Sequence, residues 1–174
     1  MGIRAMMATA HPKLGLRPFL PADALLLREI FRDSIEELTS EDYTEAQQEA
    51  WASVADDAHD FGEKLSGQLT LVATLEGSPV GFASLLGKEK IDMLYVHPAA
   101  AGQGVGAMLV DALEKLAGSR GAAKLVVDAS DSARGFFEKR GYVAQQRNSI
   151  SIGDEWLANT TLHKQLVAKR EEAP

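Results

Sequence analysis

The sequence predicts an α/β (α+β) fold, a single mixed β-sheet with helices on its faces, and three observations carry that prediction. The chain of 174 residues has the length of one ordinary domain, and 45% of it is hydrophobic, which is enough for a full core. Hydrophobic residues recur at helical spacing in the first third and alternate from about residue 68. Strand-like and helix-like segments then follow one another without a repeat or a linker.

The N-terminal third predicts a strand followed by helices. Residues 14–20 (LGLRPFL) alternate in character and stop near Pro21, which indicates a short strand. Residues 21–38 open with proline and aspartate and carry apolar side chains at helical spacing, which predicts a helix. A second helix is expected over residues 44–54, and a weaker pattern indicates another helix around residues 56–65.

The remaining elements complete the expected order β-α-α-β-β-β-α-β-α-β-β. A hairpin is predicted around residues 76–79 because an alternating run lies on each side of these turn residues. Pro98 should end the next strand, and Gly141 should end the last helix, since glycine accepts the left-handed conformation found at helix ends. The expected segments are the hairpin 68–87, strand 90–98, a helix from residue 105 to about 119, strand 123–130, helix 131–142, and strands 143–153 and 155–166.

Composition excludes several classes of protein. A net charge of −7 argues against binding nucleic acid through phosphate neutralisation, and no apolar run reaches the ~20 residues of a membrane span. The chain has no cysteine, which excludes disulfides and thiolate metal sites and fits a reducing cytoplasm. We therefore expect a cytoplasmic domain over residues 13–168, with a loose leader at 1–12, a tail at 169–174, and neither nucleic acid nor membrane as partner.

A glycine-rich loop, VHPAAAGQGVGAML, is the strongest local motif. Gly102, Gly104 and Gly106 directly precede the expected helix, where backbone N–H groups can surround a phosphate. The spacing also fits the dinucleotide fingerprint, with Asp128, 21 residues after Ala107, as the ribose-binding acid. A dinucleotide-binding fold opens with this strand–loop–helix unit and continues with further βαβ units. Here about 95 residues precede the unit and a single further helix follows it, which counts against that reading. A third possibility is a turn whose glycines serve packing alone.

The segments LYVHPAAAGQGVGAMLVDALEKLA and LVVDASDSARGFFEKRGYV resemble the GNAT superfamily of acyl-CoA-dependent N-acetyltransferases, and the resemblance covers about residues 14–166. It implies a mostly antiparallel sheet splayed at its centre, with acetyl-CoA (coenzyme A) as cofactor. The N–H groups of the loop would bind the pyrophosphate, and the strand LYV would bind the pantetheine and the acetyl carbonyl. The cofactor-binding residues that it implies are Leu94, Tyr95, Val96, Gly102, Gln103, Gly104, Val105, Gly106, Ala107, Ser130, Ser132, Phe136 and Phe137.

Three positions depart from the pattern of that family. Ala101 replaces the usual arginine or glutamine, so one polar phosphate contact is absent, and Ser130 stands where asparagine is common. Phe137 occupies the position at which many members have a tyrosine that protonates the leaving thiolate. Because the pKa of a thiol is ~8.5, a thiolate is an adequate leaving group near neutral pH even without an acid. Ser132, Tyr142, Tyr95 or water could assist its departure.

The candidate catalytic residues are Asp92, Asp128 and Tyr95. An attacking amine must lose a proton, so a carboxylate or a chain of water molecules is wanted nearby, and both aspartates lie on the strands expected to flank the acetyl group. No metal is required. His97 is expected to be a loop residue. Glu155 and Trp156 could line the acceptor pocket, although a tryptophan is more often part of a core.

The acceptor is expected to be a small-molecule or peptide amine. Eleven acidic residues and no lysine or arginine lie between Asp33 and Glu63, in the segment that should wall the acceptor site. Such a wall attracts cations, and Tyr43 and Trp51 could offer aromatic faces to them, although a simple solvated face explains the same acids. We expect an N-acetyltransferase, monomeric or homodimeric, that works by direct attack in a ternary complex. The alternatives are a non-catalytic acyl-CoA sensor and a nicotinamide-dependent oxidoreductase.

Overall fold

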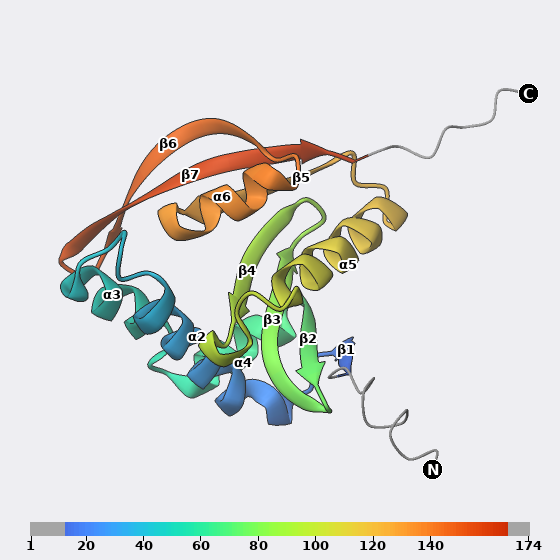
Figure 1. The fold of residues 1–174 in the computed structure, drawn as a ribbon, viewed down its shortest axis with the longest axis horizontal. Helices are drawn as coiled ribbons and strands as arrows, with labels where there is room; N and C mark the ends of the chain where they lie inside the picture. The colour runs from blue at the N-terminus through green and yellow to red at the C-terminus, as the bar shows by residue number, and fades with distance from the viewer. Residues whose placement is uncertain (1–12, 167–174) are drawn as a thin grey trace, which may run out of the picture.

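The computed structural model describes residues 13–166, so the expected leader and the tail at 169–174 lie outside the described residues (Figure 1). Seven strands form one sheet in the order β1-β2-β3-β4-β5-β7-β6. Every neighbouring pair is antiparallel except β4 and β5, which confirms the mixed, mostly antiparallel sheet. The strands are β1 (Leu14–Pro18), β2 (Leu69–Leu75), β3 (Ser78–Leu86), β4 (Lys90–Val96), β5 (Lys124–Ser130), β6 (Val143–Ile152) and β7 (Glu155–Gln165).

The structure adds one helix to the predicted order, because the weaker pattern at residues 56–65 forms a third α-helix before β2. Within residues 13–166, no helix is long and apolar enough to cross a membrane. The α-helices are α2 (Ala24–Leu38), α3 (Glu45–Ala52), α4 (Ala58–Ser66), α5 (Val105–Ser119) and α6 (Asp131–Lys139), with single 3-10 turns η1 (Pro21–Asp23), η2 (Ser53–Ala55) and η3 (Pro98–Ala100).

The turn between β2 and β3 is tighter than the sequence predicts. It consists of Glu76 and Gly77, while Ser78 and Pro79 already belong to β3. Both turn residues have positive φ, 50° and 83°, as a two-residue hairpin of type I′ requires. The position of Pro79 in the strand coincides with a break in the β2–β3 register after Ala73, where a missing N–H is tolerated.

Helices cover both faces of the sheet and bury two separate cores (Figure 1). Helix α5 lies across β3 and β4 and packs Leu109 and Leu113 against one face, where Phe137 of α6 joins the same cluster. Helix α2 packs Leu27 and Phe31 against the other face together with α4. The two faces are therefore occupied by different halves of the chain.

The sheet opens between its two parallel strands. β4 and β5 pair only through Lys90 with Val126 and Ile91 with Val127. The β3–β4 register shifts at the next residue of β4, Asp92, and such a bulge adds local twist. β5 pairs with β7 along its whole length, with Asp128 opposite Thr161, and so stays with β7 where its pairing with β4 ends. The strands therefore diverge from Asp92 onward, which confirms the expected central splay.

Candidate active site

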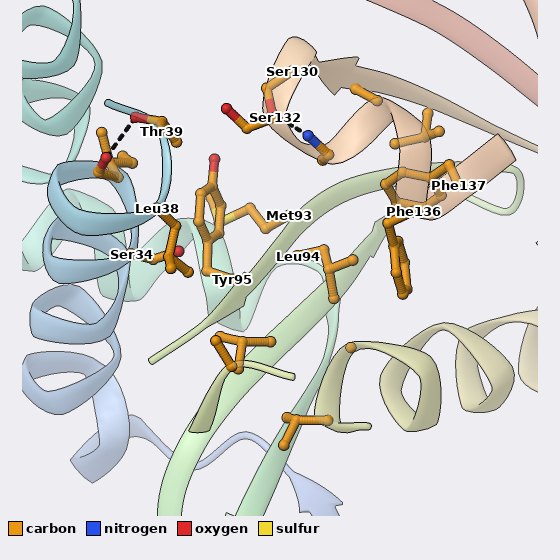
Figure 2. A pocket seen from close by; sticks show the side chains of 18 of the residues that line it. Ser34, Leu38, Thr39, Met93, Leu94, Tyr95, Ser130, Ser132, Phe136 and Phe137 are labelled. Atoms are coloured by element: carbon orange, nitrogen blue, oxygen red, sulfur yellow. Dashed lines mark hydrogen bonds between the residues drawn. The ribbon is translucent and has the colours of Figure 1, made fainter. Parts of the chain in front are cut away.

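A cavity of about 570 Å³ fills the opening between β4 and β5. Figure 2 shows Tyr95 standing near its middle, with α2 on one side and the start of α6 on the other. All of the expected cofactor-binding and catalytic residues line this cavity except Gln103. The side chain of Gln103 turns back, and its amide nitrogen donates a hydrogen bond to the Ala99 carbonyl at 3.3 Å.

The glycine-rich loop forms the entrance to α5 at one side of the cavity. Gly102 and Gly104 adopt the left-handed conformation, with φ of 76° and 84°, and Gly104 is the N-cap of α5. A Cβ at either position would meet no protein atom within 4 Å, so the space beside the loop is open to a ligand. The free N–H groups of the first helical turn, with the positive end of the helix dipole, suit a pyrophosphate.

His97 holds the chain that leads into this loop. Its Nδ1 accepts a hydrogen bond from the Ala99 N–H at 3.1 Å and so caps η3. Its Nε2 lies 3.5 Å from the Asp33 carboxylate on α2. The imidazole therefore has a structural role: it caps η3 and connects the end of β4 to α2.

Strand β4 presents an unpaired backbone edge to the cavity. The N–H of His97 bonds to the Val80 carbonyl on β3, so the alternating groups of Leu94 and Val96 point to the opposite edge. That edge has no strand partner, because the pairing with β5 ends at Ile91. These N–H and C=O groups are free to bind an extended, amide-containing chain such as pantetheine.

Phe137 is part of the core below the cavity. Its side chain is 2% exposed, and its ring packs edge-on against Phe136 and Tyr142, with centroids 5.2 and 5.1 Å away. The Tyr142 hydroxyl turns to Glu114 at 3.3 Å and does not line the cavity. Neither residue is placed to donate a proton in the cavity, so Ser132, Tyr95 and water remain of the helpers that the sequence suggests.

Asp92 is held from the α4 side of the sheet. Its Oδ2 accepts a hydrogen bond from the Gln68 amide at 2.9 Å and lies 3.4 Å from the Lys64 ammonium. Neither partner could be expected from the local sequence, because Lys64 lies in the last turn of α4 and Gln68 in the turn before β2, both far from Asp92 along the chain. Asp92 thus lines the cavity with a carboxylate that is already neutralised by neighbours.

Asp128 lies across the opening and is held more firmly. Burial raises the pKa of this carboxyl, but the Thr161 hydroxyl and the Lys90 ammonium outweigh burial and leave the pKa below its usual value. Thr161 donates at 2.6 Å, and the Lys90 Nζ lies 3.1 Å from Oδ2. Asp128 is therefore a fixed, ionised group and a weak base.

Tyr95 lines the same cavity as the two aspartates. Burial raises the pKa of its phenol strongly, so the hydroxyl stays protonated at neutral pH. The hydroxyl accepts a hydrogen bond from the Trp51 indole at 3.2 Å, which leaves its own proton to donate elsewhere. Phe31 and Phe82 contact its ring from α2 and β3 and fix its direction.

A second cavity of about 160 Å³ adjoins the first. The two share Trp51, Tyr95, Asp128 and Ser130. Its remaining lining residues are Tyr43, Ile150, Ile152, Leu157, Ala158 and Asn159. The alternating sequence NSISI in β6 could have indicated that Ile150 and Ile152 share one face of the strand and line this cavity.

Glu155 and Trp156 do not line either cavity, and Trp156 is 63% exposed, so it belongs to neither the pocket nor the core. The expected aromatic pair is present, because Tyr43 and Trp51 both line the second cavity with their rings 5.4 Å apart. Tyr43 also donates to the Ala158 carbonyl at 2.6 Å and accepts from the Asp131 N–H at 2.9 Å. This phenol joins the α3 region to β7 and α6.

Comparison with known proteins identifies the family. The family described as acetyltransferase (GNAT) domain matches residues 39–157. An uncharacterized N-acetyltransferase of Escherichia coli, YafP, is 32% identical over 144 residues, which cover 83% of this chain and 91% of that protein.

Two solved structures share the fold. A GCN5-related N-acetyltransferase from Rhodopseudomonas palustris, whose description also reads "Aminotransferase, Class-II", is 64% identical; the match has a TM-score of 0.87 and covers 90% of this chain and 97% of the other. PaiA N-acetyltransferase from Thermoplasma acidophilum, solved with coenzyme A, is 17% identical. That match has a TM-score of 0.73 and covers 88% of this chain and 99% of the other. The nicotinamide alternative is thereby set aside. The chain belongs to the GNAT family of N-acetyltransferases, enzymes that take their acetyl group from acetyl-CoA.

Proposed function

We propose that this enzyme acetylates a cationic primary amine by direct attack on acetyl-CoA within a ternary complex. The observation that carries the proposal is the junction of the two cavities at Tyr95 and Asp128. The larger cavity has the glycine-rich loop and the open β4 edge for the cofactor, and the smaller one has the carboxylate and aromatic rings for an ammonium group.

In the proposed reaction the amine nitrogen attacks the thioester carbonyl, a C–N bond forms, and the C–S bond breaks. Asp128 attracts and orients the ammonium group and an adjacent water molecule, which carries the amine proton to solvent because the pKa of Asp128 is too low to retain it. Tyr95 donates a hydrogen bond to the departing thiolate. Asp92 is the alternative group for the first role, but it lines the larger cavity alone, whereas Asp128 lines both cavities.

The direct test is acetyl transfer itself. Purified protein, acetyl-CoA and a panel of primary amines should release free coenzyme A thiol and yield an amine whose mass has grown by one acetyl group. A melting-temperature rise with acetyl-CoA, caused by binding to the native state alone, reports cofactor binding separately. Cofactor binding without thiol release on any amine would identify a sensor instead of an enzyme.

Substituting Phe137 with tyrosine should change turnover by less than about tenfold, or ~1.4 kcal/mol in the barrier. The ring is packed between Phe136 and Tyr142, so an added hydroxyl joins the core and not the reacting atoms. Unfolding free energy should fall by about 1–3 kcal/mol if that hydroxyl finds no partner. A gain in turnover of about a hundredfold or more (~2.7 kcal/mol) would mean that the natural enzyme lacks an acid that it needs.

A further inference from the structure

The second cavity combines one charge with apolar walls. Among its lining residues, Asp128 is the single ionised side chain. Its walls are mainly hydrocarbon and aromatic, from Ile150, Ile152 and Leu157 on the β6–β7 hairpin and from Tyr43 and Trp51 opposite. A ligand that fits such a site has one cationic group and an apolar body.

The oxygen atoms of the uncharged polar side chains that line the cavity already accept hydrogen bonds within the protein, and that of Tyr95 accepts from the Trp51 indole. The Ser130 hydroxyl accepts from the Ala133 N–H, and the Asn159 side-chain oxygen accepts from the Asn148 amide at 2.9 Å. The Tyr43 hydroxyl both donates and accepts hydrogen bonds to backbone groups. A ligand rich in hydroxyl or ammonium groups would therefore bury hydrogen-bond donors that find few free acceptors, which costs free energy.

The size of the second cavity suits a small apolar body. Its volume of about 160 Å³ is close to that of a dry protein cavity that holds benzene, about 150 Å³. The cavity is also elongated along β7, because Asp128 pairs with Thr161 whereas Ile150 pairs with Leu157, four residues away. Four residues of strand span roughly 13 Å. A single ring on a short chain, or an unbranched alkyl chain, matches these dimensions.

We infer that the acceptor is a monoamine with a hydrocarbon body, whose ammonium group binds Asp128 and whose body fills the second cavity. The inference rests on the proposed acetyl transfer and adds the chemical class of the substrate. It excludes polyamines and aminoglycosides as the preferred acceptors. The same chemistry is found in a free alkyl or arylalkyl amine and in the side chain of a peptide lysine.

The test is a comparison of kcat/KM for five acceptors: 2-phenylethylamine, n-hexylamine, Nα-acetyl-lysine methylamide, spermidine and kanamycin. One of the first three should exceed spermidine and kanamycin by at least about tenfold, since charges without partners weaken binding. If the lysine derivative has the highest kcat/KM, the natural acceptor is a peptide lysine. If 2-phenylethylamine or n-hexylamine has the highest kcat/KM, the natural acceptor is a free amine. If spermidine or kanamycin is the best acceptor, the inference is wrong although acetyl transfer stands. If none releases thiol, the proposed function fails and the inference fails with it.

A variant moves the specificity in a defined direction. Ile150 is 38% exposed, so Ile150→Glu can be accommodated and would put a second carboxylate on the far wall. It should lower kcat/KM for 2-phenylethylamine at least about tenfold and raise it for an unbranched alkanediamine.

The matched control is Ser151→Glu, one residue along β6 on the opposite face, where the side chain does not line the cavity. Ser151→Glu should leave kcat/KM for 2-phenylethylamine and for the alkanediamine near the values of the natural enzyme. The acetyl-CoA melting shift verifies that both variants are folded. Equal selectivity in the natural enzyme and Ile150→Glu would overturn the inference.

Discussion

Replacing Gly104 with valine should abolish acetyl-CoA binding while the fold survives. Gly104 is the N-cap of α5 with φ of 84°, a conformation that a β-branched residue adopts only with strain. Its Cβ would project into space that holds no protein atom within 4 Å, beside the N–H groups that should receive the pyrophosphate. We expect acetyl-CoA affinity to fall about a hundredfold or more, and the melting-temperature rise at saturating cofactor to disappear.

The chain offers a control that separates backbone strain from cofactor contact. Gly121 follows α5 at its other end, has φ of 88° and also has open space at its Cβ position. Gly121→Val should therefore lose comparable stability and keep the full acetyl-CoA shift. A normal shift in Gly104→Val, or an equal loss in both variants, would remove the loop from the cofactor site.

The second large effect is expected at Asp128. Asp128→Asn removes the single charge that the second cavity offers to an ammonium group and the group that orders water at the junction. We expect kcat/KM for the amine to fall at least about a hundredfold, within the range typical of acid–base groups, with acetyl-CoA binding unchanged. Asp92→Asn is the comparison and should cost less than about tenfold, because Asp92 does not line the second cavity, where the ammonium group is proposed to bind.

The pH dependence follows from the lowered pKa of Asp128. A carboxyl whose pKa is lower in the folded than in the unfolded state stabilises the fold above its unfolded pKa of ~3.9. That contribution is lost as the pH falls through the folded value. Asp128 therefore stays ionised between about pH 5 and pH 8, and kcat/KM should rise with pH along the titration of the acceptor amine. An acidic limb that disappears in Asp128→Asn would instead make Asp128 a titrating general base. Near-normal rates in Asp128→Asn would exclude it from the mechanism.

The glycine-rich loop at the larger cavity could be predicted because its signals are local in sequence. Gly102 and Gly104 lie within a few residues of the helix that they introduce, and glycine before a helical pattern has a direct structural meaning. The open edge of β4 was expected only from the resemblance to the family. It depends on a register shift at Asp92, which no local pattern reveals.

The acceptor half depends on contacts between distant segments. Tyr43 and Ala158 are hydrogen-bonded across 115 positions of the chain, and Trp51 reaches Tyr95 across 44. Asp128 was recognised as a candidate from its place at the end of a strand, but Lys90 and Thr161, which set its pKa, lie on two other strands. Sequence spacing therefore indicated the carboxylate and could not indicate its strength as a base.

The central claim is that the acetyl group passes directly from acetyl-CoA to an amine where the two cavities meet. It is tested most directly by initial rates of thiol release with both substrates varied, using the best acceptor of the panel. Direct transfer requires both substrates to be bound together, so reciprocal plots should intersect. Parallel plots, with coenzyme A released before the amine binds and an acetylated enzyme detectable by mass, would contradict the account.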